Sequence, residues 1–157
     1  MGLRDSLTGL ANRRLLLDRV AVALARTSRS ALPVSVFFVN LDGFGTVNDN
    51  LGHDAGDQVL RSVARSLAAT VRPADTVARL GGDEFVVVCE GIDAAHVDEL
   101  TERLRWSVAS AGHGQLPVTG SVGVARSYPD ESAEAVLARA DEDMFLTKRA
   151  RVRSIAS

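Results

Sequence analysis

Residues 77–88 read VARLGGDEFVVV, two apolar runs separated by a pair of glycines and a pair of acids. Runs of this kind joined through Gly81 and Gly82 predict a β-hairpin, because glycine adopts the positive φ angles that a tight turn requires. Asp83 and Glu84 follow the turn at adjacent positions, where strand side chains point to opposite faces, so only one of them can face a given ligand. These residues fit two interpretations: a solvated turn, or a carboxylate that holds a hard cation beside a phosphate.

The composition is that of an ordinary globular chain, with 157 residues of which 46% are hydrophobic. We therefore expect a single domain over residues 1–157 with one sizeable core. A net charge of −2 and a pI of 5.9 argue against a surface that coats nucleic acid, so we expect neither DNA nor RNA as a partner. No apolar run reaches membrane-spanning length and no signal peptide opens the chain, which predicts a cytoplasmic domain. The single cysteine, Cys89, predicts a buried structural thiol.

Apolar residues at helical spacing predict helices near residues 15–26, 57–71, 97–108 and 136–145. Residues 34–39 predict a buried strand, residues 118–124 a strand interrupted by glycines, and residues 46–56 a turn-dense segment. Residues 112–115 predict a loop, and residues 149–157 a basic tail. Together with the hairpin, this order predicts an α/β sandwich (α+β) in which helices cover a mainly antiparallel central sheet.

Polar residues follow the first strand and precede the second helix. If that strand lies beside the hairpin, Asn40 and Asp42 come near Asp83, and oxygen ligands there suit Mg²⁺, which binds carboxylates together with phosphate oxygens. Asn48 and Asp57 flank a glycine-rich turn and together offer donors and acceptors to a guanine edge. The alternative is ordinary turn and cap chemistry, with Asp57 as the N-cap of the helix that follows.

Five motifs occur in one order along the chain: DSLTGLANR at 5–13, NLDGF at 40–44, ND at 48–49, GHDAGD at 52–57 and RLGGDEF at 79–85. In these motifs, from about Asp5 to Lys148, the chain resembles the GGDEF family of diguanylate cyclase domains. The resemblance implies a fold akin to nucleotide cyclase catalytic domains and the polymerase palm. It also implies that two GTP molecules, one on each of two facing domains, condense into cyclic di-GMP and two pyrophosphates. A lone domain is then inactive until it forms a homodimer with a second GGDEF domain.

The resemblance also assigns roles to residues of this chain. Asp83 becomes a ligand of Mg²⁺ (or Mn²⁺), together with the Leu41 carbonyl and the Asn40 side chain. Glu84 is a second catalytic acid, in support or in proton transfer. The residues implied in substrate binding are Phe44, Asn48, His53, Asp57, Gly81, Gly82 and Lys148. These roles fit the reaction, because attack of a 3′-hydroxyl on an α-phosphate needs charge neutralisation and in-line placement more than covalent help.

Three positions depart from the family pattern. Asn40 stands where the family has a metal-binding Asp, which removes one negative charge from a site for a dication. Gly45 stands where the family has Lys, and Val152 where it has Arg. Arg151 and Arg153 lie beside Val152 as candidates to replace that Arg. We therefore expect nucleotide binding to survive and turnover to be reduced or abolished.

Arg72 and Asp75 precede the hairpin, with five residues between Asp75 and Gly81. They match the family's Arg-x-x-Asp inhibitory site, where the product cyclic di-GMP binds. A planar guanidinium suits this role, because it can grip a phosphate or a guanine edge. The alternative is an Arg at a helix end and an Asp in a turn.

Two other functions stay open. The first is a degenerate GGDEF domain that binds GTP or cyclic di-GMP and regulates an adjacent domain; in the family, an EAL phosphodiesterase domain often follows. The second is a protein-interaction domain without nucleotide. Because nothing precedes the first motif, we also expect an upstream sensory or dimerising domain in the full-length protein.

The remaining conspicuous residues predict structural roles. Trp106, Met144 and Phe145 lie on or beside apolar helix stripes, and we expect them to pack. His96 and His113 have no metal-ligand partner at a useful spacing.

Overall fold

The computed structural model describes residues 2–27, 32–112 and 117–156. These residues form, in chain order, α1 (Arg13–Thr27), β1 (Ser35–Asp42), α2 (Phe44–Leu51), α3 (His53–Thr70), β2 (Thr76–Gly81), β3 (Glu84–Cys89), α4 (Ala94–Ala111), β4 (Thr119–Arg126) and α5 (Ala133–Ala156). The predicted order of helices and strands is confirmed, with α2 added after the first strand. Apart from Gly112, the loop predicted at 112–115 lies outside the described residues, and so does His113.

The predicted hairpin is confirmed. β2 and β3 are antiparallel and meet at Gly81 and Gly82, whose φ angles are 132° and 49°. Among the described residues, four strands form one sheet in the order β2-β3-β1-β4, and each neighbouring pair is antiparallel. β1 therefore lies between the hairpin and β4, and its last residues lie beside the glycine turn.

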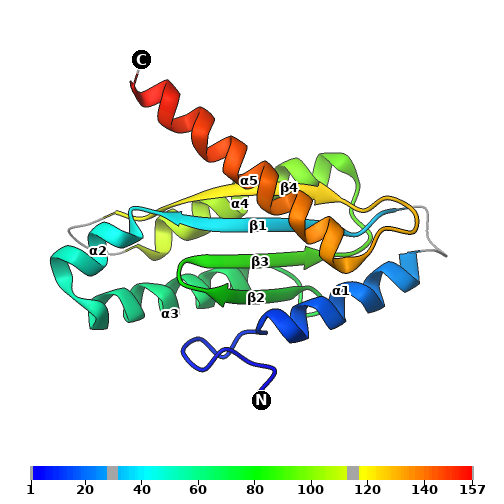
Figure 1. Cartoon of the computed structure of the whole chain (residues 1–157), viewed down its shortest axis with the longest axis horizontal. Helices are drawn as coiled ribbons and strands as arrows, with labels where there is room; N and C mark the ends of the chain where they lie inside the picture. Colours follow the sequence, from blue (N-terminus) through cyan, green and yellow to red (C-terminus); the bar gives the residue numbers. More distant parts are fainter. Residues whose placement is uncertain (1, 28–31, 113–116, 157) are drawn as a thin grey trace.

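Helices cover both faces of this sheet (Figure 1). Phe37 and Val39 pack on the side of α2, α3 and α4. Val36 and Phe38 point the other way and pack against α1 and α5, because alternate residues of a strand face opposite sides. Both faces of β1 are buried, which explains why its sequence is continuously apolar. The architecture is the predicted α/β sandwich.

The segment 46–56 is largely helical rather than turn-dense. α2 ends at Leu51, and α3 begins at His53 directly after Gly52, which has a φ of 87°. Asn, Asp and Gly favour turns in isolation, but Phe44 and Val47 are buried in the core, and this packing stabilises α2.

α5 continues through the segment predicted as a basic tail. The helix runs to Ala156, and Figure 1 shows its last turns passing beyond the sheet. The basic residues of 148–153 are therefore carried on a helix, where positions three or four apart share a face. Among the described helices, none is long and apolar enough to span a membrane.

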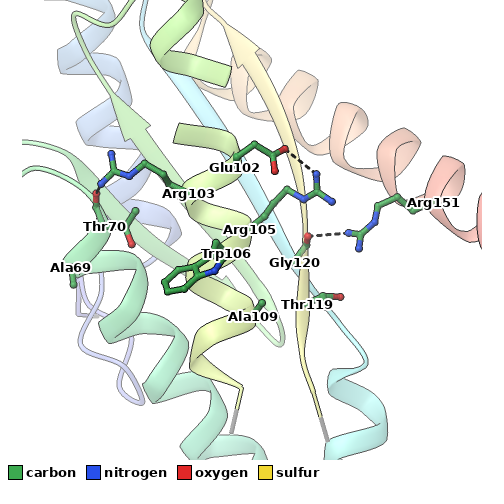
Figure 2. A pocket seen from close by; sticks show the side chains of 10 residues that line it. All are labelled: Ala69, Thr70, Glu102, Arg103, Arg105, Trp106, Ala109, Thr119, Gly120 and Arg151. Carbon is green, nitrogen blue, oxygen red and sulfur yellow. Dashed lines mark hydrogen bonds and ion pairs between the residues drawn. The ribbon is translucent and has the colours of Figure 1, made fainter. Parts of the chain in front are cut away.

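Two of the residues expected to pack are exposed instead. Trp106 is 73% exposed on α4 beside a hollow of about 710 Å³ (Figure 2). Phe145 is 55% exposed on α5, with the Arg149 guanidinium over its ring. Both predictions are wrong, because each residue lies just outside the buried stripe of its helix. Met144 and Cys89 are buried as predicted, and burial raises the pKa of the Cys89 thiol to about 12.

Candidate functional site

The end of β1 lies against the turn of the hairpin. The Leu41 N–H donates to the Asp83 carbonyl at 3.1 Å, and Asn40 is directly opposite Glu84 in the pairing of β1 with β3. The C=O of a strand residue points to the same side as its N–H, so the Leu41 carbonyl also faces the hairpin. The structure thus brings together the three residues predicted as metal ligands.

Arg79 braces the glycine turn. Its Nε and Nη2 donate to the Gly82 carbonyl at 3.2 and 2.9 Å, and its Nη1 donates to Asp5 Oδ1 at 2.9 Å. Burial opposes ionisation of Asp5, but hydrogen bonds from Thr8 and Arg79 lower its pKa. The first motif of the chain therefore fixes the hairpin turn. Neither Asp5 nor Arg79 was predicted to have a role of its own, because the two lie 74 positions apart in the sequence.

The carboxylates at the turn lie close enough to other carboxylates to repel them, and a bound cation would reduce this repulsion. Burial raises the pKa of Glu84, and the charges of Asp141 and Asp83 raise it further. Arg13 opposes this shift. In the described part of the chain, no side chain donates a hydrogen bond to the Asp83 carboxylate. Asp141 belongs to α5, and no local pattern in the sequence indicates that it lies near the hairpin.

Lys148 reaches the same end of β1 from α5. Its Nζ donates to Asn40 Oδ1 at 2.6 Å and lies 3.6 Å from Asp42 Oδ1. Arg151, one turn further along α5, donates to Asp42 Oδ2 at 3.2 Å. Val152, which stands where the family has Arg, is 60% exposed. The lysine predicted to contact the triphosphate is therefore beside a predicted metal ligand.

The predicted guanine-binding pair lies where α2 meets α3. Asn48 Oδ1 fills the space next to Gly56, where an added Cβ would overlap it. Asp57 follows Gly56, so the two predicted guanine ligands come from adjoining points of the two helices. Among the described residues, neither side chain has a hydrogen-bond partner within the protein. Because α3 begins at His53, the interpretation of Asp57 as an N-cap is wrong.

The first turn of α2 begins directly after β1. Gly43 precedes it with a φ of 81°, and no side chain caps it. The N–H groups of Phe44 and Gly45 therefore belong to the unpaired donors of a helix N-terminus, a place that favours anions. His53 is exposed and is the first residue of α3, which follows the end of α2 at Leu51 and the linking Gly52.

Arg72 and Asp75 lie at a second hollow, between the end of α3 and α4. Arg72 donates to Asp75 at 2.8 and 3.1 Å and to the Glu90 carbonyl at 2.8 Å, and its pairing with Asp75 raises its pKa. The hollow has a volume of about 300 Å³ and is also lined by Arg103, which sequence analysis did not single out. The Asp75 N–H donates to the Arg72 carbonyl at 2.9 Å. The pair therefore both closes a turn and lines a hollow.

The oxygen atoms at the end of β1 are of the kinds that bind a hard divalent cation. A carboxylate, a backbone carbonyl and an amide oxygen are all ligands that Mg²⁺ accepts. Asn40 adds no charge, however, and its Oδ1 already accepts from Lys148. Among the described residues, no three or more His, Cys, Asp or Glu side chains are grouped so that they could hold a metal ion. His96 contacts Asp93 at the start of α4 and lies outside this site.

A family model described as "Diguanylate cyclase, GGDEF domain" matches residues 3–154. The chain belongs to the GGDEF family. Its five motifs occupy the loop before α1, the end of β1, α2, the start of α3 and the β2–β3 turn. The end of β1 leads directly into α2 and lies against the β2–β3 turn.

Curated relatives match this GGDEF domain over nearly its whole length. Response regulator PleD of Caulobacter vibrioides is 37% identical over 155 residues, which cover 94% of this chain and 34% of PleD. Diguanylate cyclase DgcP of Pseudomonas aeruginosa is 38% identical over 152 residues, covering 94% of this chain and 23% of DgcP. The GGDEF domain spans about a third or less of the length of these relatives.

Solved structures share its fold. The GGDEF domain of DgcB from Caulobacter crescentus, solved in complex with cyclic di-GMP, has a TM-score of 0.88 at 31% identity, over 96% of this chain and 92% of that one. A sensory box/GGDEF family protein from Caulobacter crescentus has a TM-score of 0.87 at 40% identity, over 95% of this chain and 99% of that one. The palm-like α/β fold predicted from the motifs is confirmed.

Proposed function

We propose that this GGDEF domain binds GTP and condenses two molecules into cyclic di-GMP and two pyrophosphates, with a turnover reduced by Asn40. The observation that carries the proposal is the Leu41–Asp83 backbone hydrogen bond, which seats the glycine turn against the end of β1. The family description and the name of the relative DgcP support cyclic di-GMP synthesis as the activity.

Guanine recognition is assigned to the junction of α2 and α3. The Asn48 amide offers a donor and an acceptor, and the Asp57 carboxylate accepts from the N–H groups of the guanine edge. Both side chains are half-buried, so their hydrogen bonds to a base are shielded from water. The groups assigned to the phosphates and their surroundings are the first N–H groups of α2 at Phe44, the bare backbone of Gly81 and Gly82, His53, and the Lys148 ammonium.

Asp83, the Leu41 carbonyl and Asn40 would hold Mg²⁺ or Mn²⁺. When bound, such an ion offsets the charge of the triphosphate and polarises the α-phosphate. Glu84 is opposite Asn40 and has a raised pKa, which suits a group that holds a proton at this end of β1. A second GGDEF domain, facing this one, brings the other GTP into line for attack by its 3′-hydroxyl.

Three features of the triphosphate side lower the expected turnover. Asn40 supplies no charge, and a metal ion on its Oδ1 would have to displace the hydrogen bond from Lys148. Gly45 and Val152 each lack a cation that the family pattern places near the phosphates. The guanine side keeps both of its predicted ligands, so binding is expected to outlast catalysis.

Incubation of the purified domain with GTP and Mg²⁺ or Mn²⁺ at high protein concentration, followed by chromatography for cyclic di-GMP, tests this proposal. We expect slow product formation by the unaltered chain and none by Asp83→Ala. Product from Asp83→Ala at the same rate would contradict the assignment of the metal site. GTP binding without any product would instead favour the second function below.

A regulatory function is favoured by the hollow beside Arg72 and Asp75. There the domain would bind cyclic di-GMP and pass the signal to a neighbouring domain, with an upstream sensory domain or a downstream EAL phosphodiesterase as its partner. The name of the relative MucR, a bifunctional diguanylate cyclase/cyclic di-GMP phosphodiesterase of Pseudomonas aeruginosa, supports such a pairing. We place this signalling in the cytoplasm, where GTP is available, and assign it no contact with DNA or RNA.

Calorimetric titration with cyclic di-GMP tests the regulatory site. Arg72→Ala removes both the guanidinium and its pairing with Asp75, so we expect the affinity to fall about tenfold or more. Arg105→Ala is the control, because it breaks another pairing three residues apart, with Glu102, on the exposed side of α4. Equal affinity of the two variants for cyclic di-GMP would remove Arg72 from the site.

A further inference from the structure

The Arg151 guanidinium fastens α5 to the sheet beside the triphosphate side of the site. Its Nη1 donates to the Gly120 carbonyl at 3.0 Å and to Asp42 Oδ2 at 3.2 Å, with Ser121 Oγ at 3.4 Å. Figure 2 shows the guanidinium extended from α5 toward Gly120 on β4. One cationic group thus joins α5 to both β4 and the end of β1.

Asp42 is shared between two cations of α5. Besides Arg151, its carboxylate has the Lys148 ammonium at 3.6 Å, and it accepts hydrogen bonds from the hydroxyls of Ser121 and Thr119. Four groups therefore surround the two carboxylate oxygens. Lys148 makes its short contact elsewhere, at 2.6 Å from the neutral Asn40 Oδ1.

This choice of partner needs a physical reason, because an ammonium binds a carboxylate more strongly than an amide of equal access. Lys148 and Arg151 are three residues apart and share a face of α5, so both can reach the end of β1. Arg151 already neutralises Asp42 and occupies one of its oxygens. The attraction of Asp42 for Lys148 is thereby weakened, and the ammonium stays beside Asn40.

We propose that Arg151 is a positioning residue: by occupying Asp42, it limits Lys148 to the longer 3.6 Å contact with that carboxylate and keeps the ammonium available to the nucleotide phosphates. The inference rests on the proposed GTP binding for its functional consequence, but not for the contact itself. Arg151 is next to the uncharged Val152 and was a candidate to replace the Arg that the family has there. Its Nη1 bonds to the protein at three acceptors, so it acts through Lys148 rather than in place of the missing phosphate-binding Arg.

Calorimetric titration with GTP in the presence of Mg²⁺ tests the functional part. We expect Arg151→Ala to weaken GTP binding about tenfold, since Lys148 would then pair with Asp42. Arg149→Ala is the matched control, because it removes the same charge from α5 at a side chain that lies over Phe145. Arg151→Met, which keeps the aliphatic stem, replaces Arg151→Ala if that variant does not fold.

Two double variants separate positioning from a general loss of stability. Adding Asp42→Asn to Arg151→Ala removes the competing charge, so we expect GTP affinity to return to within about twofold of the unaltered chain. In a Lys148→Ala background, Arg151→Ala should cause no further loss. An equal effect of Arg151→Ala with and without Lys148, or no recovery with Asp42→Asn, would overturn the proposal.

A crystal structure of the nucleotide-free Arg151→Met variant provides a readout that does not depend on GTP. We expect Lys148 Nζ to lie within about 3 Å of an Asp42 oxygen, the length of a charge-assisted hydrogen bond, and to leave Asn40. Lys148 still on Asn40 would refute the inference even if GTP binds. Failure of the unaltered chain to bind GTP, together with movement of Lys148, would refute the proposed function and leave the positioning contact standing.

Discussion

The two halves of the proposed nucleotide site are built in different ways. The guanine half, formed by Asn48, Gly56 and Asp57, comes from one continuous segment in which α2 turns into α3. The triphosphate half, formed around Asn40, is assembled from β1, the hairpin, the start of α2 and α5, with 108 residues between Asn40 and its partner Lys148. The three departures from the family pattern all fall in the triphosphate half.

We expect the guanine half to determine which nucleotide binds, and the triphosphate half to determine how fast it reacts. A base is recognised by a few hydrogen bonds of fixed geometry, and each lost bond leaves a polar group unpaired, so substitutions there have a steep cost in affinity. Charge acts over longer distances and is shared among neighbours, so we expect the proposed triphosphate half to tolerate the loss of one charge. On the proposed assignment, the chain keeps the family's residues where local geometry matters most and departs from them where charge is distributed.

The largest expected effect is in the guanine half. Asp57→Ala removes the acceptor for the guanine N–H groups and should weaken GTP binding about 100-fold, as measured by calorimetry. Asp54→Ala removes the same charge from the first turn of the same helix and serves as the control. If the two variants bind GTP equally, the guanine half has been placed wrongly.

Gly56→Ala tests whether guanine binding depends on the local packing of Asn48 against the helix backbone, and not on charge. The new Cβ would overlap Asn48 Oδ1 and force the amide to turn away. We expect GTP affinity to fall about 30-fold, since one hydrogen-bonding partner of the base is displaced. Ala55→Gly, one residue earlier on α3, changes the helix without touching Asn48. Unaltered GTP binding by Gly56→Ala would show that Asn48 takes no part.

Asn40→Asp tests the triphosphate half in the opposite direction. The added carboxylate restores a charged ligand for the metal ion and should raise cyclic di-GMP synthesis about tenfold. GTP affinity should change less than the rate, because the base is bound elsewhere. Asn50→Asp, on the exposed side of α2, makes the same change of charge away from the site. A rate unaltered by Asn40→Asp would place the limiting defect at Gly45 or Val152.

The contrast between local segments and distant contacts also explains how much of the fold could be predicted from the sequence. The hairpin, the buried strand and the long helices depend on local period and on Gly81-Gly82, and these predictions are confirmed. α2 was missed because Asn48-Asp49-Asn50 favours a turn, and only the burial of Phe44 and Val47 in the folded chain overrides it. The course of α5 beyond residue 148 was missed because its exposed basic residues carry no apolar period.

For the candidate site, the motifs named its residues and the predicted neighbours meet in space, but the connections between them could not be predicted. The pairing of Arg79 with Asp5 joins residues distant in the sequence, and nothing local indicates it. Arg151 was one of two candidates beside Val152, and its bonds to Asp42 and Gly120 depend on the angle at which α5 crosses the sheet. Tertiary contacts of this kind follow from packing, which periodicity does not encode.

The smallest expected effect concerns an ion pair outside both halves. It shows how much a loss of stability alone changes GTP affinity. Glu131 accepts two hydrogen bonds from Arg139 at 2.7 Å, and these bonds, against burial, lower its pKa from the ordinary 4.5. Because the folded pKa is below the unfolded one, the stabilisation is present above pH 4.5 and is lost as the pH falls through the folded value.

Glu131→Gln should therefore lower the free energy of unfolding at pH 7 by about 1 kcal/mol in urea titrations. The difference from the unaltered chain should shrink as the pH falls below the ordinary carboxyl range. Glu102→Gln, in the more exposed pairing with Arg105, should have a smaller effect at either pH. GTP affinity should be unaltered in both variants, because neither residue belongs to the proposed nucleotide site. A parallel loss of GTP affinity in Glu131→Gln would mean that stability alone moves binding, and the contrast between the two halves would then need correcting for it.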